Sequence, residues 1–225
     1  QNGEVVRDAT ATGDVSGGAG YAGGLIGDHT NGETIENVSA IGDVASDGDY
    51  TGGLFGRVSA SVSNSSASGT VTSTSGGYVG GLVGQYNPSQ AATIANVSAS
   101  GNVSTSGNRV GGLVGQAFSG SNKPITVSDA HASGAVNATD AGNTAYAGGL
   151  VGEFQNAGNL TDVSATGDVS AQASADGRDV GGLVGSLQHN SGSYVVANAS
   201  ATGNVNATGQ RVGGLIGRHH TGTIL

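Results

Sequence analysis

The sequence contains no cysteine, no methionine and no tryptophan, and only two of its 225 residues are proline. Without cysteine, a disulfide framework, a thiolate metal site and a cysteine nucleophile are excluded. No run of about 18 apolar residues occurs, so no membrane-spanning helix is expected. Lysine and arginine total 7 against 16 acidic residues, and the formal net charge of −9 argues against a nucleic-acid partner. The chain starts with Gln1 rather than methionine, which favours a processed or excised piece.

Glycine is abundant instead, with 44 residues, and a repeat accounts for it. The glycines do not fall at every third position, which excludes collagen. The motif Gly-Gly-Leu-(Ile/Phe/Val)-Gly recurs at residues 23–27, 52–56, 80–84, 111–115, 148–152, 181–185 and 213–217. Two further elements recur with it in constant order: Ala-x-Gly-x-Val, and an aliphatic residue followed two positions later by Asn or Asp. Seven copies of three ordered elements indicate a repeat protein.

The three elements predict three short β-strands in each repeat. Each is too short for an ordinary helix, and the intervening segments are rich in turn-forming residues. In one Ala-x-Gly-x-Val copy, Ala40, Gly42 and Val44 would point one way and the residues between them the other. Across the seven copies this second set is mostly Thr, Ser, Asp and Asn, the pattern of a half-buried strand. The expected fold is therefore all-β: a parallel β-solenoid, or β-helix, of about seven coils that forms one domain over residues 1–225. A β-propeller is the alternative, although its blades need about 40 residues and four strands.

The glycine core followed by Asn-Val-Ser-Ala and Gly-Asp-Val resembles the GLUG motif, most clearly at residues 79–84 and 94–99. Repeats of this family occur in large secreted or surface-attached proteins of bacteria and archaea, including adhesins. The resemblance covers essentially the whole chain. It implies an exported role that is structural or adhesive, and it brings no catalytic residues.

No constellation of side chains predicts catalysis or a bound cofactor. Asp14, Asp43 and Asp168 share an outward column, but Thr, Asn and Ala occupy other copies of it, so a solvated polar face is expected. The glycine cores are not Gly-x-Gly-x-x-Gly loops opening a helix, and the calcium-binding pattern Gly-Gly-x-Gly-x-Asp is absent. We therefore expect no enzyme, no cofactor and no metal site. A β-solenoid polysaccharide lyase or hydrolase is a remote alternative.

One column of the repeat always carries Asn or Asp, at positions 8, 37, 64, 96, 129, 162 and 198. These side chains could bond to local backbone at a corner between strands, or the asparagines could carry N-linked glycans. Eight Asn-x-Ser/Thr sequons are present. The better glycosylation candidates lie outside the column, at Asn102, Asn137, Asn159 and Asn206. The less favoured candidates lie within it, at Asn37, Asn64, Asn96 and Asn198.

The Gly-Gly-Leu-x-Gly strand is apolar on both faces. One ladder consists of Leu25, Leu54, Leu82, Leu113, Leu150, Leu183 and Leu215. The residues that follow these leucines form the second ladder, and only one ladder is expected to face the core. The other would be covered by loops or by another chain, since an apolar stripe usually marks an interaction surface. The candidates for a lateral assembly face are the leucines together with Tyr21, Tyr50, Tyr78 and Tyr146.

The sequence thus predicts a non-enzymatic extracellular or cell-surface protein, a repeat segment of a fibre, filament or adhesin stalk. The alternative is an adhesin module that binds carbohydrate or a host surface. Neither end of the chain shows a capping element, and open β-edges invite pairing with another chain. Val5, Val6, Ile224 and Leu225 are therefore candidates for head-to-tail stacking of copies, unless flanking coils of the same polypeptide cover them.

Overall fold

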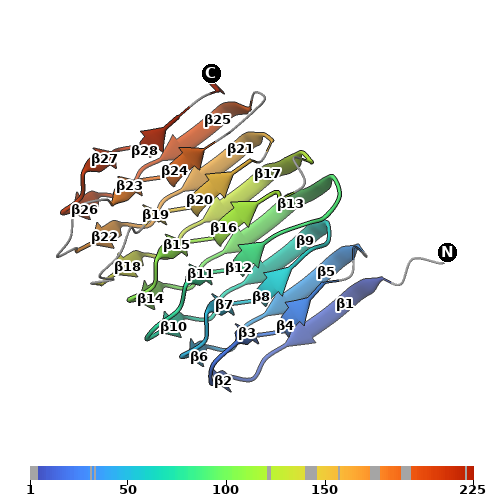
Figure 1. Cartoon of the computed structure of the whole chain (residues 1–225). Helices are drawn as coiled ribbons and strands as arrows, with labels where there is room; N and C mark the ends of the chain where they lie inside the picture. Colours follow the sequence, from blue (N-terminus) through green and yellow to red (C-terminus); the bar gives the residue numbers. More distant parts are fainter. Residues whose placement is uncertain are drawn as a thin grey trace.

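The computed structural model describes residues 5–30, 32, 34–120, 123–139, 146–156, 158–172, 178–188, 194–220 and 222–225. In this part the chain is all β and winds as a parallel β-solenoid, with corresponding strands of successive coils side by side (Figure 1). The predicted fold class is confirmed. The strands form four parallel sheets, named here A to D in the order in which each coil visits them.

Sheet A comprises β1 (Val6–Ala11), β5 (Ile35–Ala40), β9 (Val62–Ala67), β13 (Ala92–Ala99), β17 (Ile125–Ala132), β21 (Leu160–Ala165), β25 (Val195–Ala201) and β29 (Thr223–Ile224). Sheet B comprises β2 (Val15–Gly17), β6 (Val44–Ser46), β10 (Val71–Ser73), β14 (Val103–Thr105), β18 (Val136–Ala138), β22 (Val169–Ala171) and β26 (Val205–Ala207). Sheet C comprises β3 (Tyr21–Gly23), β7 (Tyr50–Gly52), β11 (Tyr78–Gly80), β15 (Arg109–Gly111), β19 (Tyr146–Gly148), β23 (Asp179–Gly181) and β27 (Arg211–Gly213). Sheet D comprises β4 (Ile26–His29), β8 (Phe55–Val58), β12 (Val83–Tyr86), β16 (Val114–Phe118), β20 (Val151–Gln155), β24 (Val184–Gln188) and β28 (Ile216–His219).

Each coil contains four strands rather than the three predicted. The Gly-Gly-Leu-x-Gly segment bends at its second glycine and its leucine, so it divides into one strand of sheet C and one of sheet D. The Ala-x-Gly-x-Val segment alternates between buried and exposed residues as predicted. Its middle residues, however, form the corner between sheets A and B rather than a strand.

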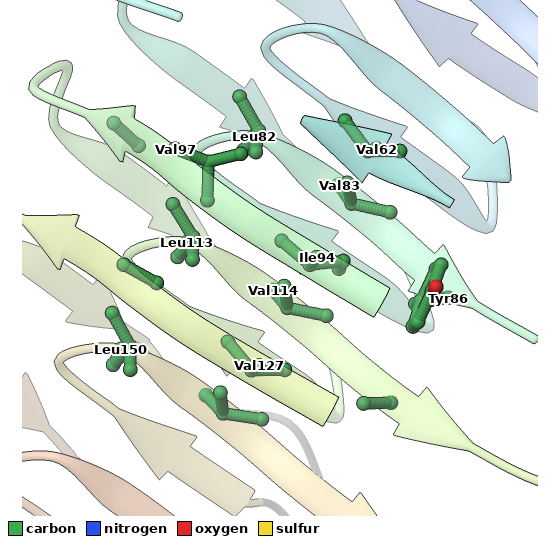
Figure 2. Packing of buried hydrophobic residues seen from close by; sticks show 14 of the residues in the cluster. Val62, Leu82, Val83, Tyr86, Ile94, Val97, Leu113, Val114, Val127 and Leu150 are labelled. Atoms are coloured by element: carbon green, nitrogen blue, oxygen red, sulfur yellow. The ribbon is translucent and has the colours of Figure 1, made fainter. Parts of the chain in front are cut away.

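Two hydrophobic cores run along the solenoid. Side chains of sheets A and D enclose the larger one, where Val62, Ile94 and Val127 of sheet A pack with residues of the Gly-Gly-Leu-x-Gly segments (Figure 2). The smaller core lies between sheets B and C and consists of valine and alanine. One coil cannot bury either set of side chains alone, so stacking of the coils supplies both cores.

Both apolar ladders of the Gly-Gly-Leu-x-Gly segment lie in the larger core, so the expectation that only one faces inward is wrong. Five leucines are completely buried, and those of the first and last coils, Leu25 and Leu215, are half-buried against the same core. The bend explains this result, because the chain turns at the leucine and directs two successive side chains to the interior. The Leu113 carbonyl accepts hydrogen bonds from the N–H groups of both Leu82 and Val83, each at 2.9 Å. The leucines therefore do not form an outer assembly face.

The Asn/Asp column adopts a left-handed backbone conformation in all seven copies, with φ between 48° and 56°. Asn and Asp tolerate this region better than other residues that carry a side chain. The column lies within the strands of sheet A, not at a corner, and is left out of the strand register. It thus acts as a bulge, which allows Ile35 and Val38, three positions apart, both to point into the core.

The side chains of this column bond to neighbouring coils rather than to local backbone. The Asn37 amide donates to Asp8 over 3.1 Å, and the Asn198 amide donates to Asp162 over 3.0 Å. The Asn96 amide donates to the Asn64 oxygen over 2.7 Å. The column therefore combines a backbone requirement with a ladder of side-chain hydrogen bonds.

Asn96→Val is expected to destabilise the chain by about 2–4 kcal/mol, because a β-branched residue is strained at positive φ and the ladder hydrogen bond is lost. Asn96→Gly keeps the backbone conformation and should cost about 1 kcal/mol, the scale of that hydrogen bond. Urea denaturation followed by circular dichroism measures both. Equal losses for the two variants would contradict the assigned role of the backbone.

Candidate functional site

Sheets C and D are in close contact at their glycines, and a groove lies between the two sheets beside this contact. A Cβ atom on Gly80 would overlap the Val83 carbonyl oxygen and lie 2.8 Å from the Gly115 nitrogen, so only glycine fits this contact. Each sheet D strand contacts the sheet C strand of its own coil and of the preceding coil, as β12 does with β11 and β7. The groove beside this contact has a volume of about 390 Å³. Its lining residues are Tyr50, Arg57, Tyr78, Gln85, Asn87, Arg109, Gln116, Phe118 and Gln155.

The sheet C wall of the groove carries a stack of tyrosine rings. Tyr21, Tyr50 and Tyr78 occupy one register position in successive strands. Their ring centroids are 4.6 Å and 4.9 Å apart, with interplanar angles of 14° and 6°. Parallel strands lie about 4.8 Å apart, so rings in register stack directly on one another. The residues of the predicted assembly face therefore do not lie together. Its tyrosines lie at the surface, whereas its leucines are in the core.

Two arginines lie against these rings. The Arg57 guanidinium carbon is 4.6 Å from the Tyr21 ring centroid, and the Arg109 guanidinium carbon is 5.1 Å from that of Tyr78. These distances are typical of cation–π interactions. Each arginine also binds a carboxylate: Arg57 forms two hydrogen bonds of 2.8 Å to Asp28, and the Arg109 Nε donates to Glu153.

The base of the groove is a buried polar network on sheet D. The Gln85 amide donates to Gln116 over 2.9 Å, and the Gln116 amide donates to Glu153 over 2.7 Å. Gln188 donates to the other Glu153 oxygen over 3.2 Å. Glu153 is only 2% exposed, yet both of its oxygens are hydrogen-bonded. A satisfied buried network of this kind holds its side chains in fixed positions.

Burial and neighbouring groups raise the pKa of three groups in the groove, Arg57, Arg109 and Tyr50. Burial by itself would lower the pKa of Arg109, but the Glu153 carboxylate outweighs it, so the pKa lies above the usual value. The hydrogen bond to Asp28 likewise raises the pKa of Arg57. Burial, followed by the neighbouring Tyr78 and Tyr21, raises the pKa of Tyr50. The groove therefore presents the guanidinium cations of Arg57 and Arg109 beside the protonated phenol of Tyr50.

This face differs in charge from the rest of the molecule. The register column of sheet C that contains the tyrosines also holds Arg109, Asp179 and Arg211. The neighbouring column of sheet D holds Asp28, Arg57, Glu153 and Arg218. Four arginines thus meet three carboxylates on these columns, whereas the whole chain has a net charge of −9.

The acidic column at the corner between sheets A and B has a structural role. The Asp14 carboxylate accepts the Asp43 N–H over 2.9 Å, and the Asp43 carboxylate accepts the Thr70 N–H over 2.7 Å. Asp168 accepts the Asn204 N–H in the same way. Among the residues that the structure describes, no three His, Asp or Glu side chains gather as a metal site would require.

The sequons fall into two groups, which differ in whether the asparagine amide donates a hydrogen bond. Within the bulge column, the amide groups of Asn37, Asn96 and Asn198 donate to the preceding coil, and that of Asn64 reaches Glu36 at 3.5 Å. These four amides are therefore engaged in the structure.

The four sequons outside the column are exposed. Asn137 and Asn206 occupy the outward central positions of β18 and β26. The side-chain oxygens of Asn102 and Asn159 accept backbone N–H groups of Ala135 and Val195, at 2.9 Å and 3.0 Å. Asn137 and Asn206 thus combine an exposed position with a side chain that takes part in none of these hydrogen bonds.

The residues expected to mediate end-to-end stacking lie at the two edges of sheet A. Strand β1 is one edge and β29 is the other. The exposed fractions are 39% for Val5, 46% for Ile224 and 80% for Leu225, and Val6 is half-buried. The described part of the chain contains no helix that is long and apolar enough to cross a membrane.

Comparison with known proteins places the repeat in a family context. The GLUG motif matches residues 75–104 and 143–170, and the first of these matches runs through one strand of each sheet, from β11 to β14. Halomucin from Haloquadratum walsbyi (strain DSM 16790 / HBSQ001) is 54% identical over 167 residues, which is 73% of this chain. The chain spans only 2% of the length of that curated relative. No solved structure matched the chain.

Proposed function

The chain is a GLUG-repeat protein, and on that premise we propose that it is a rigid, non-enzymatic segment of an extracellular or cell-surface protein. The observation that carries the proposal is the in-register stacking of seven coils through four continuous sheets. The backbone hydrogen bonds of all four sheets run along the solenoid axis, and at about 4.8 Å per coil the body is about 34 Å long. Such a body acts as a stiff spacer whose outer faces present side chains to partners.

An enzymatic role lacks support in the groove. The two carboxylates beside the groove, Asp28 and Glu153, are each bound by an arginine. A lyase or hydrolase needs an acidic or basic group that is free to exchange a proton with the substrate. The lyase or hydrolase alternative is therefore not proposed.

Surface display can be tested by labelling, because the chain has no cysteine of its own. With Asn137→Cys, we expect a membrane-impermeant maleimide to label intact producing cells, since this side chain is exposed on sheet B. The neighbouring variant Ala138→Cys is the matched control, because that position is completely buried and should react only after denaturation. Labelling of Asn137→Cys only after cell lysis would contradict an extracellular location.

Two finer features belong to the same proposal. Further coils, from a second copy or from flanking polypeptide, would extend sheet A at β1 and β29, where Val5, Val6, Ile224 and Leu225 offer apolar contacts. Sedimentation of the 225-residue chain tests pairing between copies, and a monomer at every concentration would exclude it. N-linked glycans would attach first at Asn137 and Asn206, and peptides of native material that contain these residues should then exceed their unmodified masses.

A second candidate function, a carbohydrate-binding module, is favoured by the groove between sheets C and D. The groove combines tyrosine, glutamine, asparagine and arginine side chains on a rigid base. Pockets that recognise polar ligands place a small number of such groups precisely on a fixed scaffold.

A further inference from the structure

We propose that the groove between sheets C and D binds a linear acidic polysaccharide through carboxylate groups on its sugar units. This inference rests on the second candidate function and specifies the class of ligand. Its binding test needs only the purified chain. Binding can therefore fail while surface labelling succeeds, and the two outcomes are distinguishable.

The extent of the groove fits an extended polymer. Its lining residues come from four successive coils, from Tyr50 and Arg57 in the second to Gln155 in the fifth. Four coils cover about 15 Å along the axis. The strand register places equivalent positions of the wall at a constant spacing, so a chain with repeating units meets similar surroundings at each coil.

The polar, uncharged lining residues suit sugar hydroxyl groups. Phenol hydroxyls and the amides of glutamine and asparagine both donate and accept hydrogen bonds, as hydroxyl groups do. Faces of Tyr50 and Tyr78 are already covered by neighbouring rings or by arginine. We therefore assign recognition to the polar atoms of the wall rather than to stacking of sugar rings on tyrosine.

The charged side chains that line the groove favour an anionic ligand. The only charged residues among the lining are the cations Arg57 and Arg109, although the chain as a whole is strongly acidic. A polyanion is repelled by the acidic surface and attracted to this one face, which favours binding in the groove over other positions.

The salt bridges of the two arginines leave binding capacity. A guanidinium has five N–H donors, and Asp28 occupies two of those of Arg57, while Glu153 is bound by the Nε of Arg109. The carboxylates and the neighbouring rings fix the position of each guanidinium before a ligand arrives. Preorganisation of this kind reduces the entropy lost on binding.

The test is isothermal titration calorimetry of the 225-residue chain with polygalacturonate, and with dextran as a neutral polymer. We expect polygalacturonate to bind, with an affinity that falls as salt rises, and dextran to bind at least about tenfold more weakly. The double variant Arg57→Gln/Arg109→Gln should lose at least about tenfold in affinity, the scale of lost hydrogen bonds to charged groups. The control Arg7→Gln, on sheet A, should stay within about twofold of the unchanged protein.

Loss of Arg109 could impair folding, because it removes a hydrogen-bond donor from buried Glu153. A second double variant, which leaves this ion pair intact, covers that case. Tyr50→Phe/Tyr78→Phe retains the stacked rings and removes only two hydroxyls, and we expect about a threefold to tenfold loss of affinity. The proposal is overturned if polygalacturonate does not bind, or if Arg7→Gln weakens binding as much as the groove variants. It is also overturned if the chain self-associates and the groove variants abolish that association, because the occupant is then a second copy.

Discussion

Leu113→Asp is expected to abolish folding of the chain. Leu113 is completely buried in the core between sheets A and D, at the bend of the fourth Gly-Gly-Leu-x-Gly segment (Figure 2). Removing the leucine side chain costs about 2–5 kcal/mol, and an unpaired carboxylate in the same position costs several more. The total is comparable to the stability of a typical domain. Far-ultraviolet circular dichroism should show loss of the β signal.

The control for this substitution is Asn137→Asp, which introduces the same carboxylate at an exposed position of sheet B. Its free energy of unfolding should change by less than about 0.5 kcal/mol. If Leu113→Asp instead left a folded chain and only dispersed its assemblies, the leucine ladder would be an outer face, and the assignment of both ladders to the core would be wrong.

Gly112→Ala is expected to destabilise the chain by about 3 kcal/mol or more, although it adds a single methyl group. A Cβ atom there would overlap the carbonyl oxygen of Gly149 in the next coil and lie 3.2 Å from the Cβ of Ala132. Backbone atoms of stacked coils cannot withdraw without loss of their hydrogen bonds, so the strain must spread to both coils. The midpoint of thermal unfolding measures the effect.

The matched control lies in the same glycine column. In the last coil, a Cβ atom on Gly214 would meet nothing within 4 Å. Gly214→Ala should therefore be neutral, or stabilise by up to about 1 kcal/mol through the lower entropy of the unfolded chain. Similar losses at the two positions would show that glycine serves backbone conformation in this column rather than contact between coils.

The repeat made the architecture predictable, because period, element order and alternation all survive in the sequence. The number of strands was not predictable, since the bend at each Gly-Gly-Leu depends on the approach of sheets C and D. Because of the same bend, the burial of both ladders could not be predicted from the sequence. A strict alternation rule allows one inward residue in two, whereas Leu113 and Val114 are adjacent and both completely buried.

The groove was only partly visible in the sequence. The tyrosines could be identified as a column, and Arg109 occupies the same column of sheet C. Arg57 and the glutamines come from sheet D, however, and nothing in the spacing relates Arg57 to Tyr21. The bulge column carried a clearer signal, because Asn and Asp are the residues that tolerate positive φ. Its side-chain ladder depends on the neighbouring coil and could be found only from the structure.

The stacked solenoid requires that successive coils pair in register, and cysteine cross-linking measures this pairing in a chain that has no cysteine. Ser104 and Asn137 are register partners in adjacent strands β14 and β18, so their Cα atoms fall within the range that a disulfide spans. Under mild oxidation, Ser104→Cys/Asn137→Cys should form an intramolecular disulfide without lowering the melting temperature. Thr72→Cys/Asn137→Cys, two strands apart in the same column, should stay reduced. Closure of the second pair and not of the first would contradict the stacked solenoid.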